Sequence, residues 1–178
     1  MRCMPRVLVG IPVYCEQRYV TRVLSEVRRY AEDILVVDDG STDQTPMLLA
    51  QQPVEVIRHA ENRGYGRSMQ DMLRWAHFDG FDWLITMDCD EQHEPASIPD
   101  FLQAIRRDEA DVISGSRYLV SAPGDDAPPG DRRAELDPVA VPGLGDAQRA
   151  AVVVGDAEAV EPHVAAGLGR GLVDVQGW

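Results

Sequence analysis

Short apolar runs alternate with amphipathic stretches along the first two thirds of the chain. The runs are continuous in Val, Ile and Leu, a pattern typical of strands that are buried on both faces. Between them, apolar residues recur at helical spacing with charged residues on the other positions. Repeated strand and helix units of this kind predict an α/β fold, with a mostly parallel sheet covered by helices and right-handed connections.

The predicted elements follow one another in a regular order. Strands are expected at residues 6–13, 34–37, 54–57, 83–87 and 111–117, and helices at 16–30, 45–51, around 69–76 and at 95–107. Ser41 and Gln44 match the capping-box pattern, which predicts the start of the second helix. Because ligands bind parallel sheets at the carboxyl ends of the strands, the polar residues that follow these strands are the candidate site.

The composition changes near residue 120. Trp178 is the only aromatic residue beyond Tyr118, and residues 121–142 contain five prolines among acidic residues. This segment is typical of a mobile acidic loop. Residues 150–154 indicate a strand and 158–168 a helix. We therefore expect an irregular C-terminal third, 121–178, beside a regular unit formed by residues 1–120.

Bulk properties exclude several classes of protein. The 178 residues carry a net charge of -13, which argues against nucleic-acid binding because phosphate recognition depends on Lys and Arg. No window approaches the roughly 20 apolar residues of a membrane span, and the N-terminus lacks a signal-peptide core, so we expect a cytoplasmic protein. Three cysteines far apart in the sequence indicate neither a disulfide framework nor a zinc cluster.

Two carboxylates one residue apart, Asp88 and Asp90, end the apolar run at 83–87. In an extended chain they face the same side while Cys89 faces away, an arrangement that can hold a hard divalent cation and a diphosphate. The alternative is a solvated acidic turn. A calcium loop of the EF-hand type is excluded because His93 and Pro99 stand where that loop needs Gly and Glu. His93 itself is either a ligand or a hydrogen-bonded loop residue.

Other strand ends carry weaker signals. Asp39, within Asp38-Asp39-Gly40-Ser41, is either part of a helix cap and tight turn or an acceptor for a ribose or a base. Gly64-x-Gly66 before a helix is a weak phosphate signal. Tyr14 and Glu16 follow the first strand, where they either contact a nucleoside or simply finish the strand.

The order of these motifs is more specific than any one of them. The series is Pro12-x-Tyr14-x-Glu16, then Val36-Val37-Asp38-Asp39-Gly40-Ser41-Thr42-Asp43, Asn62-x-Gly64, Met87-Asp88-Cys89-Asp90-x-Gln92-His93 and Gly115-Ser116-Arg117-Tyr118. Together the motifs resemble family 2 glycosyltransferases of the GT-A fold, which is Rossmann-like. Within that family they look most like the dolichyl-phosphate mannosyltransferases and their bacterial polyprenyl-phosphate relatives. The resemblance covers about residues 5 to 120.

The resemblance implies a role for each matching residue. The implied donor-binding residues are Pro12, Tyr14, Glu16, Val37, Asp39, Asp88, Cys89 and Arg117. Asp88, Asp90 and Gln92 would bind Mg²⁺ or Mn²⁺, with Cys89 in place of the usual small residue. Asp90 and Arg117 would take the catalytic roles, with Arg132 or Arg133 joining Arg117 near the phosphates. Glu91 adds a charge where the family often has a neutral residue.

The reaction that the resemblance implies is inverting transfer of a hexose from a nucleotide sugar, of the GDP-mannose or UDP-glucose class, to a polyprenyl phosphate. The enzyme would then be cytoplasmic and peripheral at the inner face of the membrane. Two other functions stay open, namely a catalytically inactive fragment that binds a nucleotide sugar and a nucleotidyltransferase. The second normally needs a basic Gly-rich loop after its first strand, which residues 12–16 do not supply.

The family's acceptor motifs are not readable after residue 120. Residues 1–120 are therefore expected to form the nucleotide-sugar-binding half. Residues 121–178 are interpreted as an atypical acidic loop and tail, which is either a divergent acceptor half or a frameshifted or truncated one.

Overall fold

The computed structural model describes residues 4–90, 95–108, 112–115, 149–153 and 172–175. The strands are β1 (Val7–Val13), β2 (Ile34–Asp38), β3 (Glu55–Arg58), β4 (Trp83–Thr86), β5 (Val112–Gly115), β6 (Arg149–Val153) and β7 (Leu172–Val175). The helices are α1 (Val20–Val27), α2 (Thr45–Leu49), α3 (Tyr65–Phe78) and α4 (Ile98–Arg107), with a short 3₁₀ turn η1 (Pro95–Ser97) before α4.

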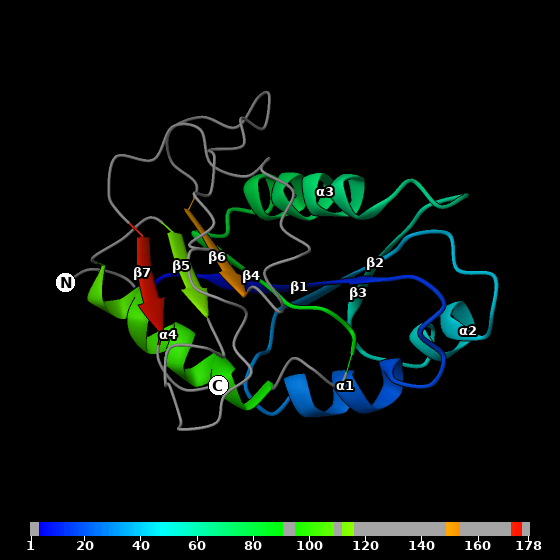
Figure 1. Cartoon of the computed structure of the whole chain (residues 1–178), viewed down its shortest axis with the longest axis horizontal. Helices are drawn as coiled ribbons and strands as arrows, with labels where there is room; N and C mark the ends of the chain where they lie inside the picture. The colour runs from blue at the N-terminus through cyan, green and yellow to red at the C-terminus, as the bar shows by residue number, and fades with distance from the viewer. Residues whose placement is uncertain (1–3, 91–94, 109–111, 116–148, 154–171, 176–178) are drawn as a thin grey trace, which may run out of the picture.

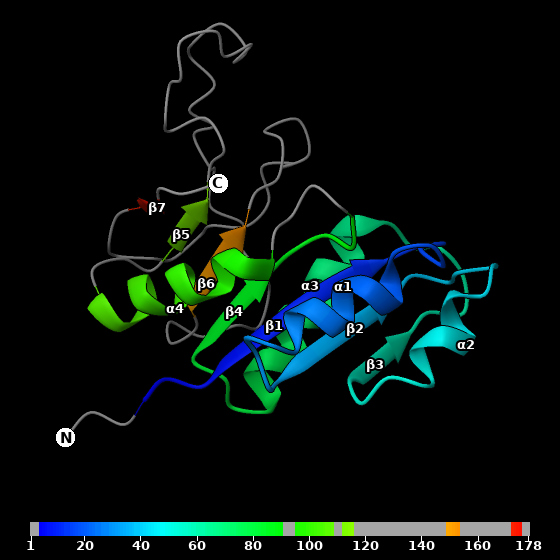
Figure 2. The same ribbon diagram turned by 90° about the horizontal axis from the view of Figure 1, so that it is seen from below.

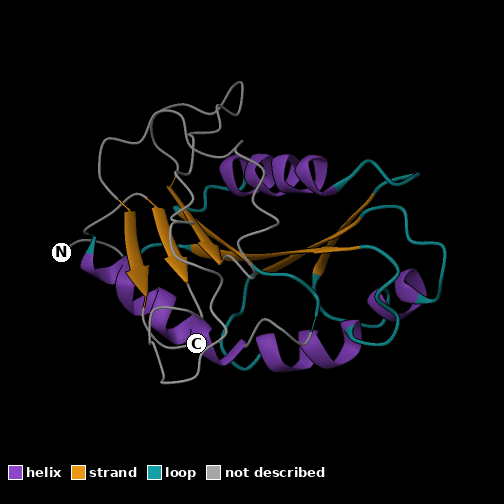
Figure 3. Ribbon diagram, in the orientation of Figure 1, coloured by secondary structure: helices purple, strands orange, loops and turns teal. Residues whose placement is uncertain are grey.

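These strands form one sheet in the order β3-β2-β1-β4-β6-β5-β7, and every pair is parallel. Helix α3 covers one face of the sheet, while α1 and α4 lie on the other (Figures 1 and 3). The view from below shows the same strands side by side across the sheet (Figure 2). The expected α/β fold with a parallel sheet covered by helices is confirmed.

Two hydrophobic cores pack against the two faces of the sheet. Val36 of β2 and Ile85 of β4 belong to the core under α1 and α4, whereas Leu35 and Leu84 belong to the core under α3. Successive residues of a strand point to opposite faces, so an unbroken apolar run supplies both cores at once. Strands β1, β2 and β4 are therefore buried along nearly their whole length, as the runs of Val, Ile and Leu predict, whereas the edge strand β3 is mostly exposed.

Helix α3 lies close to the sheet because β1 carries a glycine beneath it. A Cβ atom built on Gly10 would stand 2.6 Å from Sδ of Met72 and 3.0 Å from Cδ1 of Leu84. A side chain here would force Met72 or Leu84 to shift, since packed interiors leave no room for an extra methyl group. Gly10 thus leaves room for the side chain of Met72 between α3 and β1.

Several boundaries differ from the sequence prediction. Helix α1 begins at Val20 instead of residue 16, and Pro95 lies in η1, so that the α-helix proper begins at Ile98. The capping-box interpretation is wrong. Gln44 is the N-cap of α2 and makes no side-chain cap, while Oγ of Ser41 accepts a hydrogen bond from the backbone N–H of Cys15. Ser41 joins two loops in place of capping a helix.

The C-terminal third contributes two strands to the sheet. Strand β6 lies close to the run predicted at 150–154, and it is inserted between β4 and β5. Strand β7 was not predicted. The loop expected at 121–142 and the helix expected at 158–168 lie outside the described residues, and the boundary near 120 stays a prediction. Within the described part of the chain, no helix is long and apolar enough to cross a membrane.

Candidate functional site at the carboxyl edge of the sheet

Four neighbouring strands, β1 to β4, end at one edge of the sheet, and each has a polar side chain within two residues of its end. Val13 of β1 is in register with Asp38 of β2, and Asp38 in turn with Arg58 of β3. The residues that follow these strands therefore meet at the same edge, together with those that follow β4. This edge gathers the polar side chains that the sequence places after separate strands.

The loops after β1 and β2 are joined by hydrogen bonds. The backbone N–H of Cys15 donates to Oγ of Ser41 at 2.8 Å, and that of Gln17 donates to Oδ2 of Asp43 at 3.2 Å. Cys15 adopts a left-handed conformation, with φ of 58°, to make this turn. These bonds hold the backbone on both sides of Glu16, so its carboxylate has a defined place at the edge.

Glu16 lies in a region of concentrated negative charge. Burial is the largest influence that raises the pKa of Glu16, followed by the charges of Asp90, Asp43 and Asp88. Carboxylates repel one another through the protein, so the protonated form of Glu16 is favoured. The loops after β1, β2 and β4 thus bring four carboxylates into electrostatic reach of one another.

Cys89 separates Asp88 from Asp90 and points into the core. Its side chain is 3% exposed and belongs to the core under α1 and α4, while both aspartates are half-buried. Burial, and then the charges of Glu16, Asp90 and Asp88, raise the pKa of Cys89 to about 12. The strand-like alternation thus continues past the end of β4, with the thiol protonated and facing away from the aspartates.

The donor set at this edge fits a hard divalent cation. Asp88 and Asp90 offer carboxylate oxygens, the ligands that Mg²⁺ and Mn²⁺ prefer, and Mg²⁺ is usually held by one or two carboxylates together with substrate phosphates. Within the described ranges, no group of three or more His, Cys, Asp or Glu side chains is arranged to hold a metal on its own. Several predicted residues lie outside the described part of the chain, namely Glu91, Gln92, His93, Arg117, Arg132 and Arg133.

Asp39 is buried and forms most of its hydrogen bonds within the protein. Its Oδ1 accepts from the backbone N–H of Arg63 at 2.8 Å and lies 2.6 Å from Nδ1 of His59, and its Oδ2 accepts from the N–H of Gly64 at 2.8 Å. Burial alone would raise the pKa of Asp39, but these hydrogen bonds outweigh it and hold the pKa below its ordinary value. Asp39 therefore fixes the loop before α3 as an anion.

His59 extends this network from the sheet to α3. Its Nε2 lies 3.0 Å from Oδ2 of Asp71, which also accepts from Nε of Arg67 at 2.7 Å, while Oδ1 accepts from Nη1 of Arg74 at 3.2 Å. Both ring nitrogens of His59 thus face carboxylate oxygens. His59 links Asp39, which follows β2, to Asp71 on α3.

The sequence interpretation did not include His59 or Asp71. Two signals could have found them. His59 lies two residues after the third predicted strand, as Asp39 does after the second. Arg67 and Asp71 are four residues apart on a helix, the spacing at which opposite charges pair.

The remaining predicted residues differ in what they expose. Tyr14 is 48% exposed and Pro12 is half-buried, so both are accessible at the edge. The side chain of Val37 is fully buried under α3, so any contact with a nucleotide would use its main chain. Tyr65 opens α3 near the aspartate pair. Desolvation of its hydroxyl, and then the charge of Asp88, raise the pKa of Tyr65, although the residue as a whole is 50% exposed.

Comparison with protein families gives a match over most of the chain. The family described as "Glycosyl transferase family 2" matches residues 8–159. The match begins in β1 and ends beyond β6, so it includes every strand end of the candidate site.

The names of two curated relatives describe enzymes that act on lipid phosphates. The chain is 36% identical over 121 residues to the undecaprenyl-phosphate mannosyltransferase of Micrococcus luteus, covering 64% of this chain and 49% of the relative. It is 30% identical over 125 residues to the UDP-N-acetylglucosamine–dolichyl-phosphate N-acetylglucosaminyltransferase of Methanococcus voltae, covering 60% and 50%. The chain thus spans about half the length of these curated relatives.

Solved structures support the fold. The glucosyl-3-phosphoglycerate synthase of Mycobacterium tuberculosis, in complex with Mn²⁺, UDP and glucosyl-3-phosphoglycerate, superposes with a TM-score of 0.53 at 17% identity. The match covers 63% of this chain and 44% of that one. At this identity the likeness shows a common GT-A architecture, as the sequence motifs predicted.

Proposed function

This chain belongs to glycosyl transferase family 2, and on that premise we propose that it transfers a hexose from a nucleotide sugar to a polyprenyl phosphate, with inversion at the anomeric carbon. The observation that carries the proposal is the half-buried pair Asp88 and Asp90 after β4, within electrostatic reach of Glu16 after β1. The names of two relatives, which act on undecaprenyl phosphate and dolichyl phosphate, support the acceptor class.

Asp88, Asp90 and Gln92 would hold Mg²⁺ or Mn²⁺ in this proposal. When bound, the cation would neutralise the nucleoside diphosphate that leaves, the Lewis-acid role open to a bound metal. The solved Mycobacterium tuberculosis relative contains Mn²⁺ and UDP, which supports this choice of cofactor and donor class. Cys89 would contribute only its main chain, since its thiol is buried in the core.

The loop after β1 would position the nucleoside. The exposed ring of Tyr14 and the half-buried Pro12 lie beside the turn that the Cys15 to Ser41 hydrogen bond fixes. Asp39 would act mainly by holding the loop at Arg63 and Gly64, since its oxygens already accept those N–H groups. A lipid phosphate is already an anion, so its attack needs positioning and charge screening more than a general base. Arg117 and the arginines after it suit that task because guanidinium groups pair with phosphate oxygens.

Donor binding tests the metal assignment. Calorimetry with GDP-mannose and with UDP-glucose, each with and without Mn²⁺, should show metal-dependent binding to the unchanged protein. Asp90→Asn should remove that dependence, whereas Asp33→Asn, which changes an exposed carboxylate before β2, should leave it intact. Equal metal dependence in both variants would overturn the assignment of Asp90.

A second candidate function is donor binding without transfer. The observation that favours it is the extent of the similarity, which covers 64% and 60% of this chain in the two relatives named above. Incubation with a radiolabelled nucleotide sugar and a polyprenyl phosphate separates the two. Lipid-linked sugar together with released nucleoside diphosphate supports transfer, while donor binding with no lipid product supports the binding fragment. The domain roles proposed for residues 1–120 and 121–178 depend on this outcome.

A further inference from the structure

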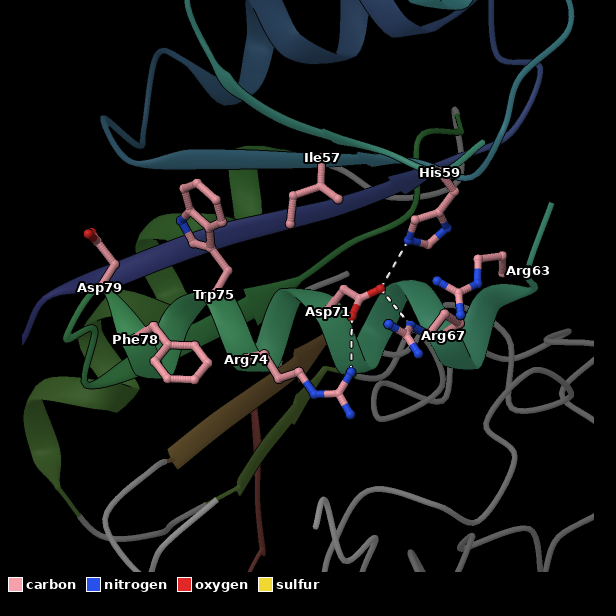
Figure 4. A pocket seen from close by; sticks show the side chains of 9 residues that line it. All are labelled: Ile57, His59, Arg63, Arg67, Asp71, Arg74, Trp75, Phe78 and Asp79. Atoms are coloured by element: carbon pink, nitrogen blue, oxygen red, sulfur yellow. Dashed lines mark hydrogen bonds and ion pairs between the residues drawn. The ribbon is translucent and has the colours of Figure 1, made fainter. Parts of the chain in front are cut away.

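A hollow of about 520 Å³ lies between the edge strand β3 and helix α3, apart from the aspartate pair. It is lined by Ile57, His59, Arg63, Arg67, Asp71, Arg74, Trp75, Phe78 and Asp79. Figure 4 shows the basic side chains gathered at one end and the aromatic rings at the other. Its volume falls within the range of small-molecule sites.

The basic end combines arginines from two elements. Arg63 comes from the loop before α3, and Arg67 and Arg74 come from α3 itself. Arg67 uses Nε for Asp71, and Arg74 uses Nη1 for the same carboxylate. Within the described part of the chain, the other guanidinium N–H groups of these two residues have no hydrogen-bond partner. They remain available as donors to an anion in the hollow.

The charge of the hollow is opposite to that of the protein. Three arginine side chains and the doubly hydrogen-bonded His59 line it, against the carboxylates of Asp71 and Asp79. The whole chain, in contrast, has a net charge of -13. A local positive excess in an acidic protein attracts anions to this place, and guanidinium forks match phosphate oxygens in particular.

The apolar end supplies a second kind of contact. Phe78 is 85% exposed at the C-terminal end of α3, and the half-buried Trp75 and Ile57 lie between α3 and the sheet (Figure 4). An exposed aromatic ring next to other apolar side chains gains free energy when a ligand covers it. The hollow therefore suits a ligand with a charged head and an apolar body.

We propose that this hollow binds a phosphomonoester that carries an apolar or aromatic group, with the phosphate between Arg63, Arg67 and Arg74 and the apolar part against Trp75 and Phe78. The site is separate from the proposed metal site, although His59 and the backbone of Arg63 contact Asp39. Strand β3 is the sheet edge and the aspartate pair follows β4, three strands away, which is roughly 14 Å at the usual strand spacing. The proposal does not depend on sugar transfer.

The test is calorimetry with phenyl phosphate and with inorganic phosphate, both in EDTA so that no metal site contributes. Phenyl phosphate should bind more tightly than inorganic phosphate. The double variant Arg63→Gln/Arg74→Gln should weaken phenyl phosphate binding about tenfold, the scale of losing one or two charge-assisted hydrogen bonds. Phe78→Ser should weaken phenyl phosphate binding and leave inorganic phosphate binding unchanged.

Arg29→Gln is the matched control, because it removes an exposed arginine that lies just after α1, a helix on the opposite face of the sheet. Binding that is equal in all variants, or absent at millimolar phenyl phosphate, would overturn the proposal. Circular dichroism of each variant shows whether it is folded, and Phe78→Ser changes a ring so exposed that it should not disturb folding.

Vesicles distinguish a lipid headgroup from a soluble phosphate. If the natural ligand is a lipid, phosphatidylcholine vesicles that contain phosphatidic acid should bind the unchanged protein, and the arginine and Phe78 variants should lose this binding. If only phenyl phosphate binds, the ligand is soluble. Metal-dependent binding of GDP-mannose or UDP-glucose by Phe78→Ser, measured in parallel, separates failure of this site from failure of the donor site.

Discussion

Two groups of carboxylates lie along the carboxyl edge of one sheet and have opposite electrostatic surroundings. Asp39 and Asp71 are joined through His59 and accept hydrogen bonds from arginines and backbone N–H groups, so the pKa of each is held below its ordinary value. Glu16 lies near Asp88 and Asp90, and its pKa is raised. The first group is neutralised inside the protein and stabilises the fold, whereas in the second the charges of Asp90 and Asp88 favour the protonated form of Glu16.

Removing the charge of Asp39 is expected to have the largest effect on stability. In the unchanged protein, both carboxylate oxygens of Asp39 accept backbone N–H groups. In Asp39→Asn, an amide NH₂ takes the place of one of these oxygens, so two hydrogen-bond donors face each other. The free energy of unfolding should fall by about 3 kcal/mol, as when one partner of a buried ionic network is lost. Urea unfolding measures this change, with the exposed Asp33→Asn as a control. Equal stability of the two variants would contradict a structural role for Asp39.

Asp71→Asn should lower the free energy of unfolding by about 2 kcal/mol at neutral pH. The substitution removes the hydrogen-bond partner that His59, Arg67 and Arg74 share. Burial would raise the pKa of Asp71, but the Arg67 and His59 hydrogen bonds outweigh it and lower the pKa. A lowered pKa stabilises the folded state above the ordinary carboxyl pKa, and that stability is lost as the pH falls through the folded value.

The unchanged protein should therefore lose stability from about pH 4 downward more steeply than Asp71→Asn does. Urea midpoints measured between pH 6 and pH 3 compare the two slopes. Asp79→Asn, which changes an exposed carboxylate near the end of α3, should keep the steep slope of the unchanged protein. Parallel curves for all three proteins would show that Asp71 does not carry this pH dependence.

Cys89→Ala should lower the free energy of unfolding by about 1 kcal/mol, because it removes a small buried group. The thiol lies between two aspartates in sequence but in the core in space. Metal-dependent donor binding by the variant should equal that of the unchanged protein, as calorimetry can establish. A loss of metal dependence with little loss of stability would instead place the sulfur among the ligands.

Glu16→Gln should change stability least, by less than about 0.5 kcal/mol, since it removes a charge that its neighbours repel. Its backbone carbonyl, which accepts the N–H groups of Tyr19 and Val20, is unaffected. Thermal unfolding of Glu16→Gln and of Asp39→Asn, measured side by side, compares the two groups of carboxylates most directly. A loss as large as that of Asp39→Asn would show that the Glu16 carboxylate is also part of the structural network.

Local sequence signals predicted most of the fold of residues 1–120. The apolar runs placed β1, β2, β4 and β5, because strands buried on both faces consist mainly of apolar residues. The sequence also placed Asp88 and Asp90 on the same side, with Cys89 opposite, through simple alternation. It did not predict β7, because Asp174 interrupts the short apolar run at Leu172–Val175.

By itself, the sequence determined the order of strands and helices and the residues that follow each strand, since both depend on short-range periodicity. Only the tertiary structure decided which carboxylates are neutralised. Asp39 and His59 are 20 residues apart, and His59 and Asp71 are 12 apart on different elements. Whether such groups meet depends on the sheet register and on how closely α3 packs over Gly10. Those distances arise from packing between distant segments, which no local pattern encodes.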